Sequence, residues 1–110
     1  MENITYDEFK KLDLRIAEIR SAEEIPGADK IYKLSIDLGG ETRELVAGLK
    51  LFYDQASLVG RKIVMLANLE PRTIRGIMSH GMLLAAGNED KSSVVLLTPE
   101  KDIPSGAKVS

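Results

Sequence analysis

Several short segments of the chain alternate hydrophobic and polar residues, which is the pattern of strands with one buried face. The alternation is clearest over residues 32–38, and it recurs over residues 12–16. The phase then breaks, which predicts a bulge or sharp bend near Ala17. The pair Gly39–Gly40 predicts a tight hairpin turn, so residues 43–47 are expected to form the returning strand.

Two segments have helical rather than alternating patterns. Thr5 and Glu8 stand at the positions of a capping box and predict a short helix over residues 6–11. Apolar residues recur at roughly helical spacing over residues 49–59, and Gly60 ends that element. The chain therefore mixes many strands with two short helices.

The stretch from 63 to 87 holds two apolar runs, at 63–67 and 82–86, which predict buried strands. The connection between them is about a dozen residues long, and connections of that length in compact domains are usually functional or disordered. Its composition is not typical of disorder, so an ordered, functional loop is predicted. Four side chains able to bind a ligand lie on it: Arg72, Arg75, Ser79 and His80.

The predicted order is three strands, a short helix, two strands and a trailing strand over 93–97. This is the plan of the OB-fold, a Greek-key barrel that binds oligonucleotides through its strand 2–3 face and its L12 and L45 loops. The prediction is an all-β, five-stranded barrel with a short N-terminal helix, a short helix between strands 3 and 4, and a C-terminal extension. The long connection becomes L45. Residues 23–29 become L12, which is acidic and an unlikely phosphate contact.

Composition narrows the class of protein. The 110 residues fit one domain over 1–110, and 44% of them are hydrophobic, enough for a packed core. There is no cysteine and a single histidine, so no disulfide, metal site or cofactor is predicted. No apolar run could span a bilayer and no signal peptide is recognisable, so a cytoplasmic location without membrane contact is expected. The net charge of −2 argues against a generally basic nucleic-acid-coating protein, although a local basic face remains open.

Four segments in order resemble one known family: FKKLDLRIAEI, PGADKIYKLSIDLGG, LVGRKIVMLANLEPRTIRGIMSHGMLLAA and PSGAKV. They are similar to the tRNA-binding domain of methionyl-tRNA synthetases. That domain also occurs as free-standing bacterial tRNA-binding proteins, in endothelial-monocyte-activating polypeptide, and at the start of phenylalanyl-tRNA synthetase β chains. The run NL-x-P-R-x-x-R-G-x-x-S-x-G-M is its most specific part.

The resemblance implies an OB-fold that binds tRNA by shape, often as a homodimer, and assists a methionyl-tRNA synthetase catalytic chain. The chain then looks like a free-standing protein, a separate β subunit or a C-terminal domain. The positions that match the tRNA-contacting residues of the family, with its strand-one arginine, are Asn68, Arg72, Arg75, Ser79, Met82 and Arg15. His80 joins the predicted tRNA contacts, at a position where relatives usually have Glu or Gln. Ala17 also departs from the family, which commonly has Gly there.

Each of these residues also has a structural alternative. The two loop arginines could be solvated, Asn68 and Ser79 could satisfy local backbone groups, and Met82 could be core. Arg15 lies opposite Leu14 and Ile16 in the alternation, where an ion pair with a neighbouring acid is as plausible as RNA contact.

Two functions other than tRNA binding are also considered from the sequence. Gly76 to Gly81 resembles a nucleophile elbow, but it is one residue too long, and the adjacent Ser79 and His80 point apart in an extended segment. The chain also has no nucleotide-binding signature of a synthetase, so no enzymatic activity is predicted. The alternative function is a protein–protein or dimerisation module of a synthetase complex with weak RNA binding, in which the chain ends cover a strand edge.

Overall fold

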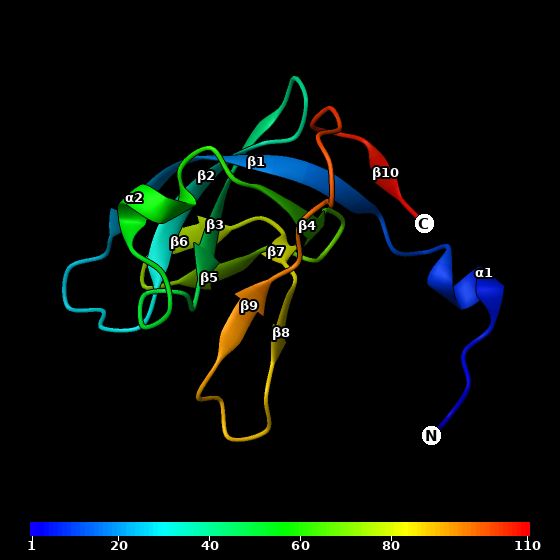
Figure 1. Cartoon of the computed structure of the whole chain (residues 1–110), viewed down its shortest axis with the longest axis horizontal. Coiled ribbons are helices and arrows are strands. Elements are labelled where there is room, and N and C mark those ends of the chain that lie inside the picture. Colours follow the sequence, from blue (N-terminus) through cyan, green and yellow to red (C-terminus); the bar gives the residue numbers. More distant parts are fainter.

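The structure, a computed structural model, describes residues 1–110. A curved antiparallel sheet surrounds its core (Figure 1). The strands of this sheet are β1 (Leu14–Glu24), β2 (Tyr32–Asp37), β3 (Thr42–Ala47), β4 (Lys62–Leu66), β7 (Met82–Leu83) and β10 (Lys108–Val109). They are hydrogen-bonded in the order β3-β2-β1-β4-β7, and β10 pairs with β1. The long β1 therefore bonds to three neighbours.

The connections confirm the predicted OB barrel. β1, β2 and β3 form a meander, α2 (Gln55–Leu58) follows, and β4 returns beside β1. β7, the fifth barrel strand, pairs with β4 and also packs against β3, so the sheet nearly closes on itself. The short N-terminal helix α1 (Tyr6–Phe9) has its capping box, in which the Thr5 hydroxyl accepts from the Glu8 amide.

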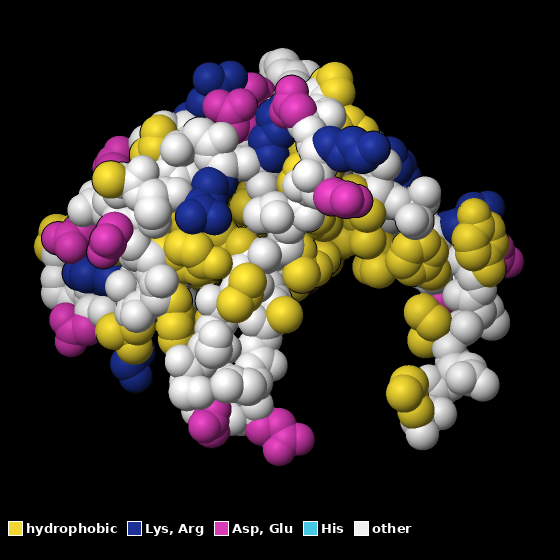
Figure 2. Space-filling model, viewed as in Figure 1, with side chains coloured by type: hydrophobic (Ala, Val, Ile, Leu, Met, Phe, Trp, Pro, Cys, Tyr) yellow, Lys and Arg dark blue, Asp and Glu magenta, His cyan; other side chains and the backbone are white.

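Two hairpins lie outside the main sheet. One pairs β5 (Arg72–Ile74) with β6 (Ile77–Ser79), and the other pairs β8 (Ala85–Gly87) with β9 (Val94–Leu96). The β8–β9 hairpin and the α1 arm project from the barrel on the same side. Figure 2 shows that the hollow between these two projections is lined with hydrophobic side chains.

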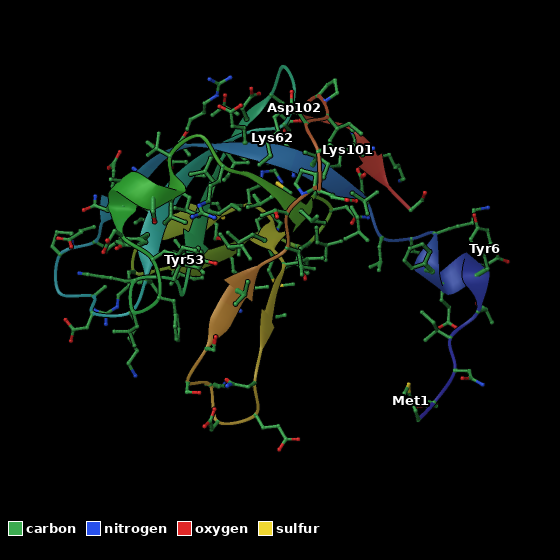
Figure 3. The ribbon with its side chains drawn as sticks, in the orientation of Figure 1. Met1, Tyr6, Tyr53, Lys62, Lys101 and Asp102 are labelled. Carbon is green, nitrogen blue, oxygen red and sulfur yellow. The ribbon has the colours of Figure 1, made fainter.

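The C-terminal extension is bound along β1 and β4. The Ile16 amide donates to Ala107 O at 2.9 Å, and the Gly106 amide donates to Ile16 O at 2.7 Å. Lys62 Nζ reaches Asp102 Oδ1 at 2.8 Å, and Figure 3 shows both side chains beside Lys101. On the edge of β1 that faces β2, the tail therefore pairs with the first residues of β1, which β2 does not reach.

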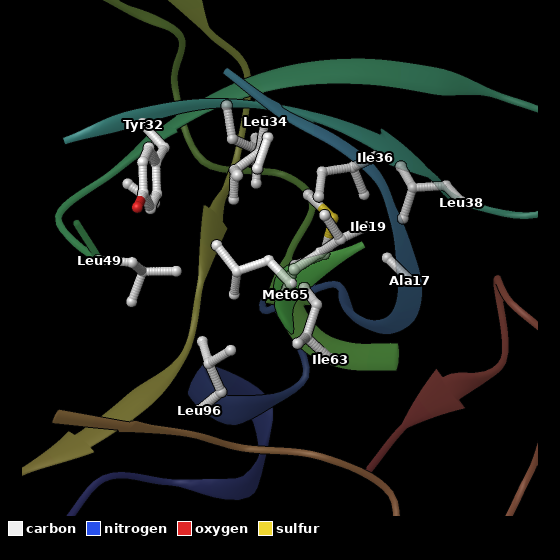
Figure 4. Close-up of a cluster of buried hydrophobic side chains, with 14 residues drawn as sticks. Ala17, Ile19, Tyr32, Leu34, Ile36, Leu38, Leu49, Ile63, Met65 and Leu96 are labelled. Atoms are coloured by element: carbon white, nitrogen blue, oxygen red, sulfur yellow. The ribbon is translucent and has the colours of Figure 1, made fainter. Parts of the chain in front are cut away.

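The core follows the alternation seen in the sequence (Figure 4). Leu34 and Ile36 of β2, Ile19 of β1, and Ile63 and Met65 of β4 all have no exposed side-chain surface. Burial of each such side chain stabilises the fold by about 1.5–3 kcal/mol. These strands form the wall of the barrel, and the two hairpins are attached to this wall.

Two local predictions were wrong in their placement. The irregularity in β1 lies between Ile19 and Ser21, where the pairing with β2 shifts register, whereas Ala17 pairs regularly with Ile63. On the β4 side, β1 stays hydrogen-bonded as far as Ile19, whose amide donates to Arg61 O at 2.9 Å and whose carbonyl accepts from the Gly60 amide at 2.7 Å. The sequence shows that the hydrophobic alternation changes phase, but it does not show at which residue the strand pairing shifts.

The helix predicted over 49–59 is confined to Gln55–Leu58. Its first half forms tight turns instead, because the amides of Phe52 and Tyr53 both donate to Leu49 O at 2.9 Å. Spacing alone did not distinguish these successive turns from a continuous helix. None of the helices is long and apolar enough to cross a membrane.

Acid should weaken the β2–β3 turn. Asp37 Oδ1 accepts from the Gly39 amide at 2.9 Å, and Oδ2 accepts from Arg20 at 2.8 Å. The bond from Arg20, followed by the bonds from the glycine amides, lowers the pKa of Asp37 below its ordinary value. A lowered folded-state pKa gives stability that is complete above the unfolded-state pKa and is lost as pH falls through the folded-state pKa.

We therefore expect stability to fall as pH drops below about 4. The variant Asp37→Asn keeps an oxygen for the turn amides but cannot titrate, so its stability should depend less on pH in this range. Urea unfolding of both proteins at pH 6 and pH 3 measures the difference. Equal losses of stability in the two proteins would contradict the role of Asp37.

Candidate nucleic-acid interface

The predicted L45 loop is largely a β-hairpin. Arg72 pairs with Ser79 and Ile74 pairs with Ile77, so only two residues form the turn. These are Arg75 and Gly76, with φ of 53° and 80°. Two positive φ angles are what a type I′ turn requires, and this turn matches the twist of the flanking strands. The hairpin therefore presents Arg75 at its tip.

The hairpin is fixed to the barrel through β6. The Val46 amide donates to Ser79 Oγ at 3.0 Å, and the His80 amide donates to Glu44 O at 2.9 Å. Ser79 is only 6% exposed. These two bonds satisfy groups on β3 that would otherwise lie at a sheet edge. The Ser79 hydroxyl therefore accepts a hydrogen bond from a backbone amide, which is the structural alternative that the sequence analysis gave for this residue.

Three of the predicted contact residues line one pocket at the base of the hairpin. Arg72, Ser79 and Met82 surround it with Glu70, and its volume is about 130 Å³. Met82 lies on β7 with 46% of its surface exposed, so it is not simple core. An exposed guanidinium beside an exposed thioether can bind a phosphate and pack on a base or ribose.

Asn68 and Arg15 lie in a second group, near the N-terminal segment. Asn68 Oδ1 accepts from the Asp13 amide at 2.9 Å, and Asn68 Nδ2 donates to Lys11 O at 2.6 Å. Arg15 Nε donates to Asp13 Oδ1 at 2.8 Å, an ion pair that lowers the pKa of Asp13. Both side chains are thus engaged within the protein.

His80 lies near this second group. The hydrogen bond and the charge of Arg43 lower the pKa of Glu41, with smaller contributions from the neighbouring His80 and Arg15. Arg43 also donates to Ala67 O. Arg15, Glu41 and Arg43 line one hollow of about 250 Å³, in which the cations are paired with acids. The structure therefore divides the predicted residues between a hairpin group and an ion-paired group.

The pairing of charges distinguishes the two groups. Seven of the fifteen lysines and arginines form ion pairs: Arg15, Arg20, Lys33, Arg43, Lys50, Lys62 and Lys108. Arg72 and Arg75 form none, and both are exposed. Exposed cations without acidic partners are available to phosphate, so the hairpin offers two such side chains.

One candidate residue escaped the sequence analysis. Lys30, at the end of L12, is exposed, forms no ion pair and lines a hollow together with Arg75. The acids of L12 argued against phosphate contact, but one of them, Glu24, is paired with Lys50 at 3.3 Å. The available signal was that Lys30 adjoins L12 and lies two residues before β2, since OB-folds bind oligonucleotides through L12 and L45.

The role of Asn68 in holding the N-terminal segment in place can be tested directly. Asn68→Ala removes two hydrogen bonds to backbone groups of the N-terminal segment, so the free energy of unfolding should fall by about 1–2 kcal/mol. Because the side chain is engaged within the protein, tRNA affinity should change less than twofold. Urea unfolding and a tRNA gel shift on the same preparation measure both quantities. A large loss of affinity with unchanged stability would instead make Asn68 an RNA contact.

A five-stranded Greek-key barrel with unpaired arginines on its strand 4–5 connection has the architecture of an oligonucleotide-binding OB domain. Comparison with known proteins identifies the family within this class of OB domains. The family described as "Putative tRNA binding domain" matches residues 14–108, and the chain belongs to this family. The resemblance found in the sequence is thereby confirmed.

The similar sequences are methionine–tRNA ligases. The chain is 50% identical over 109 residues to that of Pyrococcus furiosus, covering 99% of this chain and 15% of the ligase. It is 46% identical over 110 residues to that of Caldanaerobacter subterraneus, covering the whole chain and 17% of the ligase. The chain thus spans only about one sixth of the length of these relatives.

Solved structures of similar size share the fold. A methionyl-tRNA synthetase related protein from Pyrococcus horikoshii matches with a TM-score of 0.94 and 34% identity, covering all of both chains. The chaperone CsaA from Bacillus anthracis matches with a TM-score of 0.89 and 32% identity, covering 99% of this chain and 100% of that one. The fold therefore occurs in proteins described in different functional terms.

Proposed function

We propose that residues 1–110 act as one non-catalytic tRNA-binding module that assists aminoacylation, as a β subunit or C-terminal domain of methionyl-tRNA synthetase. The observation that carries this proposal is the β5–β6 hairpin, with Arg72 and Arg75 exposed and free of acidic partners. The arginines hold backbone phosphates, while Met82 packs on a ribose or base. Recognition is therefore by shape and backbone, and the module itself does not aminoacylate.

The first test is competition between RNAs. A labelled tRNA bound to the protein is challenged with unlabelled tRNA or with an unstructured RNA of equal length. We expect tRNA to compete at least about tenfold better, because the hairpin and barrel present a rigid surface to a folded RNA. Equal competition by the two RNAs would contradict recognition of tRNA shape.

The partners in this proposal are tRNA and the synthetase catalytic chain, in the cytoplasm. Methionyl-tRNA synthetase lacking its own tRNA-binding domain should gain tRNA affinity, and charge tRNA at lower tRNA concentration, when this chain is fused to it. The isolated chain should form no aminoacyl-tRNA from methionine, ATP and tRNA. A fused chain that leaves the KM for tRNA unchanged would contradict the assisting role.

A second copy of the chain is the proposed occupant of the hollow between α1 and the β8–β9 hairpin. Tyr6 is 72% exposed and Ile4 64% exposed on the arm, and Val95 is 54% exposed on the hairpin. None of the α1 residues is buried. An arm this short is not stable without packing, and a homodimer would supply the packing.

Light scattering tests the homodimer, with Tyr6→Ser/Leu12→Ser as the variant, since Leu12 is also exposed on the arm. We expect twice the chain mass for the wild type and a lower mass for the variant. If the protein dimerises but tRNA competes no better than unstructured RNA, the alternative function is favoured, a protein–protein or dimerisation module with weak RNA binding. A monomeric wild type contradicts the proposed homodimer.

A further inference from the structure

A hollow of about 300 Å³ joins the tip of the β5–β6 hairpin to the L12 loop. It is lined by Gly27, Ala28, Asp29, Lys30, Ile31 and Arg75. A volume of about 300 Å³ is at the lower end of the range for small-ligand pockets, so the hollow suits a ligand of the size of one nucleobase. It therefore brings together Arg75 of the predicted interface and L12, a loop that the sequence analysis expected not to contact phosphate.

The hollow has chemically distinct parts. Ile31 is half-buried and offers apolar surface to the hollow, whereas Ala28 is only 4% exposed and belongs to the floor beneath it. Lys30 and Arg75 are exposed, and neither forms an ion pair, even with Asp29 in the same lining. Two free cations and one free carboxylate give the hollow a net positive charge. An apolar surface with a hydrogen-bonding group and cations matches the base and the phosphate of one nucleotide.

The L12 wall is held in place by Lys50. The Lys50 amide donates to Lys30 O at 3.2 Å, and Lys50 Nζ donates to Ala28 O at 3.3 Å. Nζ also pairs with Glu24 at 3.3 Å. The Ala28 amide donates to Ile25 O at 3.0 Å, which closes a turn within the loop. Lys50 is thus a positioning residue, and the shape of the wall does not depend on a bound ligand.

We propose that this hollow binds one unstacked nucleotide of the RNA and selects guanine. Arg75 and Lys30 bind the phosphate, and the base packs on Ile31. The Asp29 carboxylate has two acceptor oxygens, which match the two neighbouring N–H donors on the Watson–Crick edge of guanine. Uracil offers one such donor between two carbonyl oxygens, which the carboxylate repels. The inference rests on the proposed function and adds base selection to recognition by shape.

The test uses two fluorescein-labelled single-stranded RNA heptamers, UUUGUUU and UUUUUUU, with binding measured by anisotropy at fixed salt. The wild type should bind the guanine heptamer at least about fivefold more tightly, since good base contacts discriminate by this much or more. Asp29→Asn leaves one acceptor oxygen in place of two and removes the negative charge. It should lower the guanine preference to twofold or less, while binding of the uridine heptamer is unchanged or tighter.

Two lysine variants complete the test. Lys30→Ala should weaken both heptamers about three- to tenfold and leave the guanine preference unchanged, since phosphate contacts carry no sequence information. Lys101→Ala is the matched control, an exposed lysine without an ion pair that lines a different hollow beside Lys62 (Figure 3). It should change neither affinity nor preference.

A wild-type preference near one, or a preference that persists in Asp29→Asn, would overturn the guanine site. A Lys30→Ala effect no larger than that of Lys101→Ala would overturn the phosphate contact. If tRNA still competes better than unstructured RNA in those cases, only the nucleotide site fails. If tRNA has no such advantage, the proposed function fails by its own test, whatever the heptamers show.

Discussion

Replacing Arg72 and Arg75 together by alanine should weaken tRNA binding about 100-fold. Each charge-assisted contact contributes about 1–2 kcal/mol, and 1.4 kcal/mol is a tenfold change in affinity. The two residues occupy opposite ends of one hairpin, with Arg72 at its base and Arg75 in its turn. The slope of log K against log[salt] should also become shallower by roughly 0.7 for each phosphate that the variant no longer neutralises.

The control for this variant carries the same change of net charge. Lys91→Ala/Lys101→Ala removes two exposed lysines that form no ion pair and lie outside the β5–β6 hairpin. A gel shift across a salt series with both double variants separates a local contact from a general charge effect. Similar reductions of affinity in the two variants would contradict binding through the strand 4–5 connection. Single variants would then show how the two arginines divide the effect.

Gly81→Ala should reduce the free energy of unfolding by about 3–5 kcal/mol. Gly81 has φ of 120°, which an L side chain rarely adopts. A Cβ there would lie 2.5 Å from Met65 Cε, 3.1 Å from Leu66 O and 3.3 Å from Leu45 Cδ2. Met65 has no exposed surface and little room to move. Backbone strain and overpacking each cost about 1–3 kcal/mol, and both apply here.

Gly76→Ala is the matched control for crowding. Gly76 also has a positive φ, of 80°, but no atom lies within 4 Å of a Cβ built there. Its cost should be about 1–2 kcal/mol, from the left-handed conformation alone. Thermal and urea unfolding of the two variants measure the difference, which isolates the packing around Gly81. Equal destabilisation would mean that the barrel accommodates the extra methyl group.

An element of this fold could be predicted where its sequence signal lay within a few neighbouring residues. The alternation over 32–38 specified β2 completely, since each buried residue faces the same core. The capping box specified the start of α1, because its hydrogen bonds join Thr5 and Glu8, only three residues apart. The register shift between Ile19 and Ser21 could not be placed from the sequence, because it lies in the pairing with β2, which the residue pattern of β1 alone does not specify.

The hairpin within L45 was missed for a different reason. Type I′ turns are recognised by Asn-Gly or Asp-Gly, and here the first turn position is Arg75. A long-chain residue at positive φ is uncommon, so the pair Arg75–Gly76 did not mark a turn. Its presence at the tip places a guanidinium beside L12, the neighbour it meets only in the folded chain.

The candidate site was predictable as a set of residues but not as a surface. The family resemblance selected Arg72, Arg75 and Met82, which lie on or beside the hairpin. It also selected Asn68, which binds backbone groups more than fifty residues away in sequence, and Arg15, which binds a carboxylate two residues away. Long-range hydrogen bonds of the Asn68 kind leave no periodic trace, so only the three-dimensional structure reveals which polar groups remain free.

The most direct test of the central claim maps the tRNA on the protein without any substitution. In the ¹H–¹⁵N spectrum of labelled protein, tRNA is titrated and the perturbed amides are assigned. The largest perturbations are expected across the β5–β6 hairpin, from Arg72 to Ser79, and in the neighbouring L12 loop. Perturbations concentrated on the β8–β9 hairpin and α1, with the β5–β6 hairpin unchanged, would contradict the central claim.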